Sequence, residues 1–211
     1  MTKILRRSLN HPTLTMVIGL TGVGKSTFAK SLASTIIDAV YIDKDTINES
    51  FLWIPKEGRR DDMLRYLPQE AISTTSDYYR QSIWIQTYHC MLMLAKQALQ
   101  LGKHPVIDCS YLKEIRWGYI EQVLKPQLTD IEYNLKIVLI HADPDIIRQR
   151  IAKRGNPRDV YAAQDENWQA LLREQPPVPE EIERYSHIKV DNSNGPVTDD
   201  QMCEVLNFLA E

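Results

Sequence analysis

The sequence GLTGVGKS at residues 19–26 decides the fold of this 211-residue chain, because it matches the pattern G-x-x-x-x-G-K-[ST]. The apolar segment TLTMVI at residues 13–18 stands directly before it and predicts a buried strand. Residues 25–37 follow it and predict a helix. A phosphate-binding loop requires this order of strand, loop and helix, so a glycine-rich turn with a coincidental lysine explains the sequence poorly.

Each residue type in this loop has an expected role in binding a nucleoside triphosphate. The glycines let the backbone direct its N–H groups inward, and the following helix adds the positive end of its dipole. We expect Lys25 to reach the outer phosphates, Ser26 to bind Mg²⁺ through its hydroxyl group, and Thr27 to lie near the inner phosphate. The predicted nucleotide-binding residues are Gly19, Thr21, Gly22, Val23, Gly24, Lys25, Ser26 and Thr27.

Short apolar segments alternate with helical ones along the rest of the chain, which predicts an α/β fold with a parallel sheet. The further strands are predicted at residues 40–42, 105–108, 134–140 and 187–190. The further helices are predicted as a turn starting near Thr46, a long helix over 76–101, a helix starting at 143–145 and ending at Gly155, and a closing helix over 198–210. Residues 1–12 are expected to form a lead-in to the sheet.

The length fits one domain covering residues 1–211, with no room for a second core of ordinary size. The net charge of −3 disfavours non-specific binding to nucleic acid. Cys90, Cys109 and Cys203 show no CxxC spacing, so we expect reduced thiols rather than a disulfide framework or a zinc site, as in the cytoplasm. No apolar run approaches the ~20 residues that a membrane-spanning helix needs.

Two stretches depart from the alternation of strands and helices. Residues 55–75 are polar, with prolines near both ends, and are expected to form an insertion on the rim of the sheet, so that 55–101 comprises this insertion and the long helix. The aromatic residues and methionines of the helix are expected to pack in the core rather than to bind a ligand: Tyr78, Trp84, Tyr88, Met91 and Met93. The segment from about 144 to 175 is predicted to form a lid and its connector.

Three aspartates follow predicted strands, where the carboxyl edge of a parallel sheet binds ligands. Asp43 and Asp45 lie at the end of the second strand, and either can accept the proton of an attacking hydroxyl group, with Asp45 preferred. Asp45 can instead serve only as an N-cap for the helical turn after it. Asp108 ends the segment VID and is expected to bind Mg²⁺ or its water opposite Ser26.

The helix after Asp143 carries three arginines, and Arg150 and Arg154 share one face because they are four residues apart. Guanidinium groups stabilise the charge on a transferring phosphoryl group, so Lys25, Asp45, Arg150 and Arg154 are the candidate catalytic residues. Arg150 is also expected to contact the nucleotide. The arginines can instead form an ordinary solvated basic face.

The loop, IDKD at 42–45, VIDCS at 106–110 and DPDIIRQRIAKRG at 143–155 together resemble the small P-loop kinases of the predicted-kinase group. That group is related to polynucleotide 5′-hydroxyl kinase, chloramphenicol phosphotransferase, adenylylsulfate kinase and zeta toxins. The resemblance covers about residues 13–160 and implies a sheet of strand order 2-3-1-4-5, a lid carrying arginines, and ATP as donor. It assigns Asp45 as the catalytic acid and places Lys189 to Ser193 near the adenine ring.

The leading functional hypothesis is a kinase that transfers the γ-phosphoryl group of ATP to a hydroxyl group of a small molecule. Aromatic residues in or near the insertion are candidates for its acceptor pocket: Trp53, Tyr66, Tyr78 and Tyr79. A second hypothesis is a polynucleotide 5′-hydroxyl kinase, which Arg59, Arg60 and Arg65 favour. The acidic total disfavours it, as does Asn48, which stands where many members of the group have an arginine.

A zeta-toxin-like kinase, which would phosphorylate a nucleotide-activated sugar, is a third hypothesis. A fourth is a regulator that binds ATP without transferring its phosphate. The guanine-reading N-K-x-D motif is absent from the sequence, which disfavours a GTPase switch.

Overall fold

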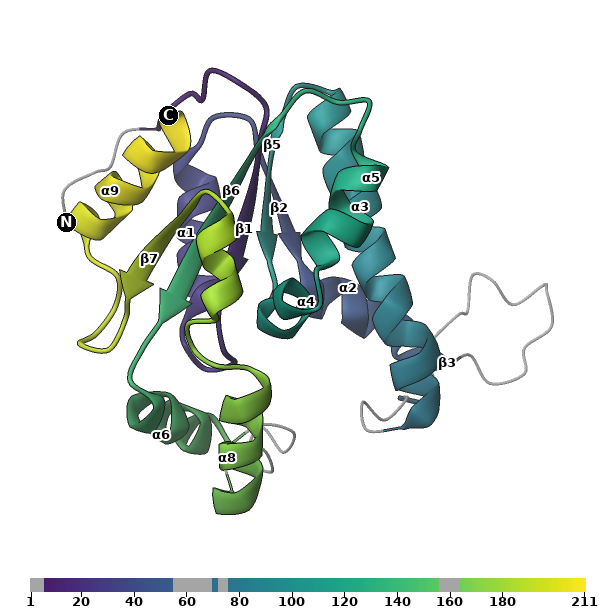
Figure 1. Cartoon of the computed structure of the whole chain (residues 1–211), viewed down its shortest axis with the longest axis vertical. Helices are drawn as coiled ribbons and strands as arrows, with labels where there is room; N and C mark the ends of the chain where they lie inside the picture. Colours follow the sequence, from purple (N-terminus) through teal and green to yellow (C-terminus); the bar gives the residue numbers. More distant parts are fainter. Residues whose placement is uncertain (1–5, 55–69, 72–75, 156–163) are drawn as a thin grey trace.

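The computed structural model describes residues 6–54, 70–71, 76–155 and 164–211. Its centre is a five-stranded parallel sheet of order β2-β5-β1-β6-β7 (Figure 1). The strands are β1 (Thr13–Ile18), β2 (Ala39–Asp43), β5 (His104–Asp108), β6 (Asn134–His141) and β7 (His187–Asp191). Numbered within this sheet, the order is 2-3-1-4-5, which confirms both the predicted α/β fold and its strand order.

Burial explains why these segments form strands. Every residue of β1 and of β5 is buried, as expected for inner strands of a parallel sheet that helices cover on both faces. Within the pairing register, Val17 lies opposite Asp108 of β5 and Val138 of β6, and Asp43 lies opposite Asp108. The two aspartates therefore end neighbouring strands at the same edge of the sheet.

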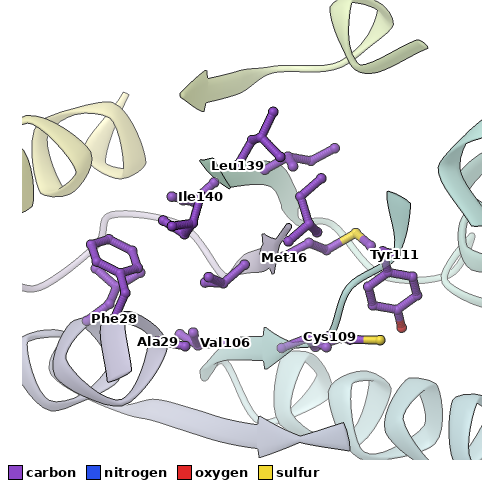
Figure 2. Close-up of a cluster of buried hydrophobic side chains, with 14 of the residues drawn as sticks. Met16, Phe28, Ala29, Val106, Cys109, Tyr111, Leu139 and Ile140 are labelled. Carbon is purple, nitrogen blue, oxygen red and sulfur yellow. The ribbon is translucent and has the colours of Figure 1, made fainter. Parts of the chain in front are cut away.

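Helices α1 (Lys25–Thr35) and α3 (Trp84–Gln100) cover the sheet near β1, β2 and β5. Helix α1 buries Phe28, Ala29 and Leu32, which share one helical face. Figure 2 shows Phe28 and Ala29 on one side of the central strands, and Cys109 and Tyr111 on the other. Helix α9 (Asp199–Ala210) closes the chain beside β7. The hydrophobic core is thus continuous through the sheet.

Most predicted boundaries are confirmed within one or two residues, and α1 shows why they differ. The prediction extends this helix to Ile37, but α1 ends at Thr35, and Ile36 is extended. The backbone of Arg7 pairs with this segment: its N–H donates to the carbonyl of Thr35, and the N–H of Ile37 donates to its carbonyl. The amino-terminal lead-in thus fixes the end of α1.

The long predicted helix over 76–101 is present, but after its first two residues a wide π-helical turn over Tyr79–Ile83 precedes α3. Tyr88 and Met91 are buried as predicted, and Trp84 packs partly buried against the core. The prediction is wrong for Tyr78 and Met93, which are exposed. The predicted insertion at 55–75 lies mostly outside the described residues. At its ends, β3 (Trp53–Ile54) and β4 (Glu70–Ala71) form an antiparallel pair.

The chain between β5 and β6 forms short helical elements that the sequence pattern did not predict: α4 (Leu112–Arg116), the π-helical turn η3 (Ile120–Leu124) and α5 (Lys125–Gln127). After β6 comes the predicted arginine helix, α6 (Pro144–Arg154), capped by Asp143 and ended by Gly155 in a left-handed conformation. Part of the predicted lid, residues 156–163, lies outside the described residues, and α8 (Asp165–Glu174) and a 3₁₀ turn, η4 (Glu180–Arg184), follow.

Cys90, Cys109 and Cys203 are free thiols. None of the helices in the described part of the chain is long and apolar enough to cross a membrane.

In Figure 1 α6 and α8 lie beyond the carboxyl ends of the strands, at the edge where the candidate site is found.

Candidate functional site

The glycine loop between β1 and α1 forms a tight turn that α6 and the segment after β7 enclose. Gly22 and Gly24 have φ of 78° and 99°, which favours glycine in both positions. A Cβ atom on Gly22 would lie 2.7 Å from Cγ1 of Ile151 in α6, and one on Gly24 would lie 2.5 Å from Nδ2 of Asn192. The loop conformation and the packing around it therefore both require glycine.

A cleft of about 80 Å³ opens at the loop, and most of the side chains predicted to bind the phosphates or to act in their transfer line it; it is called the phosphate cleft below. Its lining consists of Thr21, Lys25, Ser26, Asp43, Lys44, Asp45, Asp108, Cys109 and Ser110. The structure therefore brings together Lys25, Ser26, Asp45 and Asp108, which come from three separate segments. Lys44 is an additional cation in this lining that the sequence motifs did not single out.

Lys25 lies part-buried in this cleft, and its Nζ donates a hydrogen bond to the carbonyl oxygen of Leu20 at 3.0 Å. Burial lowers the pKa of Lys25, and the nearby negative charges of Asp108 and Asp45 oppose that shift. A further anion beside the ammonium group would compensate for its lost hydration. The site is thus electrostatically suited to a phosphate group.

Asp43 and Asp45, the two candidates for accepting the proton of the attacking hydroxyl group, have different environments. Asp43 is the N-cap of α2 (Lys44–Phe51): its carboxylate accepts hydrogen bonds from the backbone N–H of Asp45 at 3.0 Å and from the hydroxyl of Thr46 at 2.7 Å. The interpretation of Asp45 as the N-cap is therefore wrong, and the helix begins two residues earlier than predicted. The side chain of Asp45 is 72% exposed, with the ammonium group of Lys44 at 4.0 Å.

Asn48 fixes α2 to α3 and to the π-helical turn that precedes it. Its side chain is buried, and its Oδ1 accepts hydrogen bonds from the hydroxyl groups of Tyr79 at 3.1 Å and Thr87 at 3.2 Å. Asn48 stands about one helical turn after Asp45, so this buried contact positions the first turn of α2. Tyr79, a candidate for the acceptor pocket, has this structural contact instead of an exposed position, whereas Tyr78 is exposed. Tyr66 lies outside the described residues, as does the side chain of Trp53.

Asp108 is only 3% exposed, and Tyr41 holds its carboxylate. The hydroxyl group of Tyr41 donates to Oδ2 of Asp108 at 2.9 Å. Burial raises the pKa of Tyr41 well above its ordinary value, and the charge of Asp108 adds to the shift. Tyr41 therefore stays a donor and orients the carboxylate that lines the phosphate cleft. No sequence signal predicts this contact, apart from the position of Tyr41 in the strand before Asp43.

The residues present are consistent with a Mg²⁺ ion held jointly by protein and phosphates. Ser26 and Asp108 line the same cleft. The described part of the chain contains no group of three or more His, Cys, Asp or Glu residues that could hold a metal alone. Mg²⁺ in such sites takes one or two protein oxygens and completes its octahedron with phosphate oxygens and water. The predicted ligands thus fit the ion only together with the nucleotide.

A second cleft, of about 440 Å³, also borders the loop. It is lined by Gly22, Gly24, Thr27, Phe28, Ser31, Arg150, Asn192, Gly195, Pro196, Val197 and Met202. Asn192 connects this cleft with the loop, because its Nδ2 donates to the carbonyl of Val23 at 2.6 Å and its own carbonyl accepts from Nη2 of Arg150 at 2.8 Å. The sequence match over Lys189 to Ser193 includes this residue but does not predict its contact.

Two buried polar atoms in this second cleft have no hydrogen-bond partner within the described residues: Nη1 of Arg150 and Oδ1 of Asn192. Leaving a buried donor or acceptor unpaired costs about 1–3 kcal/mol, so a polar ligand or a water molecule that paired with these atoms would be stabilised. The volume is in the range of ligand-binding clefts. A nucleoside between α1, α6 and the segment after β7 would offer partners to both atoms.

The two predicted lid arginines reach different parts of the site. Arg150 faces the second cleft, whereas Nη2 of Arg154 donates to the hydroxyl of Thr21 in the loop at 3.3 Å. Helix α6 is held against the loop by Ile147 and Ile151, which are fully buried and lie beside Gly22. The structure thus places Arg154 at the phosphate cleft and Arg150 beside the larger cleft.

Comparisons with known proteins agree with this geometry. The sequence model of the family described as "AAA domain" matches residues 14–177. A kinase candidate from Chloroflexus aurantiacus has 17% identity and a TM-score of 0.58, with 94% of each chain covered. A sugar kinase from Janibacter sp. HTCC2649 has 16% identity and a TM-score of 0.54, again with 94% of each chain covered. The predicted likeness to small P-loop kinases is confirmed for the fold. A comparison with curated proteins finds no match.

Proposed function

The chain belongs to the AAA-domain family of P-loop proteins, and from that premise we propose that it is an ATP-dependent kinase that phosphorylates a hydroxyl group of a small molecule. One observation carries the proposal: an exposed carboxylate, that of Asp45, lines the same cleft as the loop residues Lys25 and Ser26. A protein that only binds a nucleotide needs no proton acceptor at this place. A kinase needs one beside the transferring phosphoryl group.

The donor half of the site is assigned from the two clefts. The nucleoside of ATP occupies the larger cleft, where Arg150 and Asn192 offer their unpaired atoms. The backbone of the glycine loop and the first turn of α1 bind the phosphates, and Lys25 neutralises the outermost. Bound Mg²⁺, held by Ser26 and Asp108 together with the phosphates, would neutralise charge that develops in the reaction.

The transfer step uses the residues around Lys25. The acceptor oxygen forms a bond to the γ-phosphorus while the bond from that phosphorus to the β,γ-bridging oxygen breaks, and the hydroxyl proton passes to Asp45. Lys25 and Arg154 stabilise the charge on the phosphoryl oxygens from two sides. Asp43, which is committed to capping α2, keeps Asp45 in place. Phosphorylated acceptor and ADP are the products.

A small acceptor is favoured over a nucleic-acid end. The net charge is −3, and Asn48, at the place of the arginine found in many related kinases, is buried in contacts with Tyr79 and Thr87. The arginines that favoured a polynucleotide lie outside the described residues. The sugar kinase of the same fold is compatible with a small hydroxyl acceptor.

Label transfer from γ-labelled ATP tests the proposed function. The protein, ATP and Mg²⁺ are incubated with pools of small hydroxyl compounds and, separately, with 5′-hydroxyl oligonucleotides. We expect label in a small product, at a rate that changes little between low and moderate salt. Label in the oligonucleotide pool, with the steep loss at higher salt that phosphate contacts produce, would contradict the small-molecule acceptor. Lys25→Ala is the control that should remove all transfer.

A further inference from the structure

A third cavity, of about 350 Å³, lies between α3 and the short helical elements that follow β5. Its walls are mostly apolar and aromatic: Trp84, Ile85, Tyr88, His89, Leu92, Glu114, Trp117, Tyr119, Gln122, Val123 and Gln127. None of these residues lines either of the nucleotide clefts. The cavity is therefore separate from the donor site, and its size is in the range of small-molecule sites.

The cavity contains one buried acid, Glu114 of α4, which is only 6% exposed. Its Oε1 accepts a hydrogen bond from the hydroxyl group of Tyr88, whereas its Oε2 has no partner in the described ranges of the chain. A carboxylate in such surroundings is stabilised by a donor, and most strongly by a cationic one. The unpaired oxygen therefore indicates a ligand that brings a donor into the cavity.

The basic residue next to Glu114 in the sequence contacts Trp117 and Glu174 rather than Glu114. Lys113, the neighbour of Glu114 in the chain, places its Nζ 4.6 Å from the ring centroid of Trp117 and forms an ion pair with Glu174. His89 is exposed at the rim. The carboxylate of Glu114 thus has no cationic partner among the described residues that line the cavity.

The rings around Glu114 form a platform for a flat ligand. Tyr88 stacks at an angle on Trp84, with centroids 5.1 Å apart, and makes an edge contact with Tyr119 at 6.0 Å. Trp117 is 56% exposed, and the ammonium group of Lys113 lies over one face of its ring, which leaves the other face for a ligand. Aromatic faces also attract cations, so the walls and the acid favour the same kind of ligand.

We propose that this cavity binds a small molecule that joins a flat aromatic body to an ammonium group, with the ring between Trp84 and Trp117 and the ammonium group at Oε2 of Glu114. Side-chain contacts connect this site with the phosphate cleft. The thiol of Cys109, which lines that cleft, donates to the hydroxyl oxygen of Tyr88 at 3.5 Å, and Tyr88 in turn donates to Glu114. Binding at Glu114 can be measured without nucleotide or transfer, so its outcome is independent of the kinase assignment.

Three indole compounds that differ in the charge of the side chain test the proposal. Tryptamine is cationic, tryptophol is neutral and indole-3-propionate is anionic. Titration by calorimetry, without nucleotide, is expected to give tryptamine an affinity about tenfold or more above that of tryptophol, with indole-3-propionate weakest. Equal affinities, or preference for the anion, would overturn the proposal.

Variants locate the binding. Glu114→Gln should abolish the preference for tryptamine, whereas Glu121→Gln, the same change at an exposed residue that pairs with Lys125, should leave it intact. Trp117→Ala removes a half-exposed wall without opening the core and should weaken all ring-containing probes, which keeps the test valid if Glu114→Gln fails to fold. Tryptamine binding that survives both changes overturns the proposal, as does a dimer in solution whose interface covers Trp117.

Discussion

The side-chain amide of Asn192 donates a hydrogen bond of 2.6 Å to the carbonyl of Val23, and so ties the end of β7 to the glycine loop across 169 positions of sequence. The same residue accepts from Arg150 through its backbone carbonyl. The larger cleft, the arginine helix and the phosphate loop therefore meet at one asparagine. Its loss should affect both the fold and the binding of ATP.

Asn192→Ala tests this relationship. The change leaves the carbonyl of Val23 without its donor and opens the wall of the larger cleft. We expect the free energy of unfolding to fall by about 1–3 kcal/mol and ATP affinity to fall by about tenfold. Urea unfolding and calorimetry measure the two effects. Asn10→Ala, at an exposed asparagine before β1, should change neither, and normal ATP affinity of Asn192→Ala would contradict the role in the cleft.

Asn48→Ala should lower both stability and transfer. The hydroxyl group of Tyr79 loses its buried acceptor, at a cost of about 1–3 kcal/mol, whereas that of Thr87 keeps the carbonyl of Ile83 at 2.8 Å. Because Asp45 lies about one turn earlier in α2, the rate of label transfer should fall while ATP affinity stays near the wild-type value. Tyr79→Phe removes one of the two donors and should have a smaller effect on unfolding. Unchanged transfer in a measurably destabilised Asn48→Ala would show that Asn48 supports the fold but not the site.

Tyr41→Phe should raise the Mg²⁺ concentration that ATP binding requires. The phenylalanine keeps the ring but removes the hydroxyl that orients Asp108. Groups that orient a metal-binding carboxylate contribute about tenfold or more to metal affinity, so the Mg²⁺ concentration needed for half-maximal ATP binding should rise by about that factor. ATP binding without Mg²⁺ should not change. Tyr133→Phe, at a tyrosine that does not line the cleft, is the matched control, and an equal response of both variants would contradict the role of Tyr41.

His104 should make the protein less stable in mild acid. Burial lowers the pKa of this side chain below its ordinary 6.5, with the charge of Lys103 acting in the same direction and that of Asp38 against it. The unfolded chain therefore binds a proton at a higher pH than the folded one, and stability falls as the pH drops from about 7 through the folded pKa. His104→Asn should lose less stability between pH 7 and pH 5 than the wild type. His11→Asn, at an exposed histidine, should retain the wild-type dependence.

The sequence was sufficient for the sheet and for expecting the glycine loop and the strand-end acids at one cleft, because each follows from a local pattern. The strand before Gly19 and the acids Asp43, Asp45 and Asp108 at strand ends could be placed once the sheet was recognised as parallel. The pattern misplaces the N-cap because Asp43 and Asp45 both precede a plausible first turn, and only the backbone decides between them.

Contacts between distant segments could not be predicted. The bonds from Asn192 to Val23 and from Tyr41 to Asp108 join residues that no periodicity relates. The end of α1 depends on the backbone of Arg7, whose carbonyl accepts a hydrogen bond from the N–H of Ile37. The aromatic cavity around Glu114 depends on the short helical elements between β5 and β6. These elements are too short to show a helical periodicity of apolar residues in the sequence.

Asp45→Asn tests the central claim, that this site transfers a phosphoryl group with Asp45 as the base, most directly. The readouts are ATP affinity by calorimetry and single-turnover transfer of label to the acceptor pool that the wild type phosphorylates. We predict ATP affinity near the wild-type value and a loss of transfer of about 10²–10⁴-fold, whereas Asp43→Asn, which keeps a side chain suited to an N-cap, should transfer at close to the normal rate. Wild-type transfer by Asp45→Asn would contradict the account.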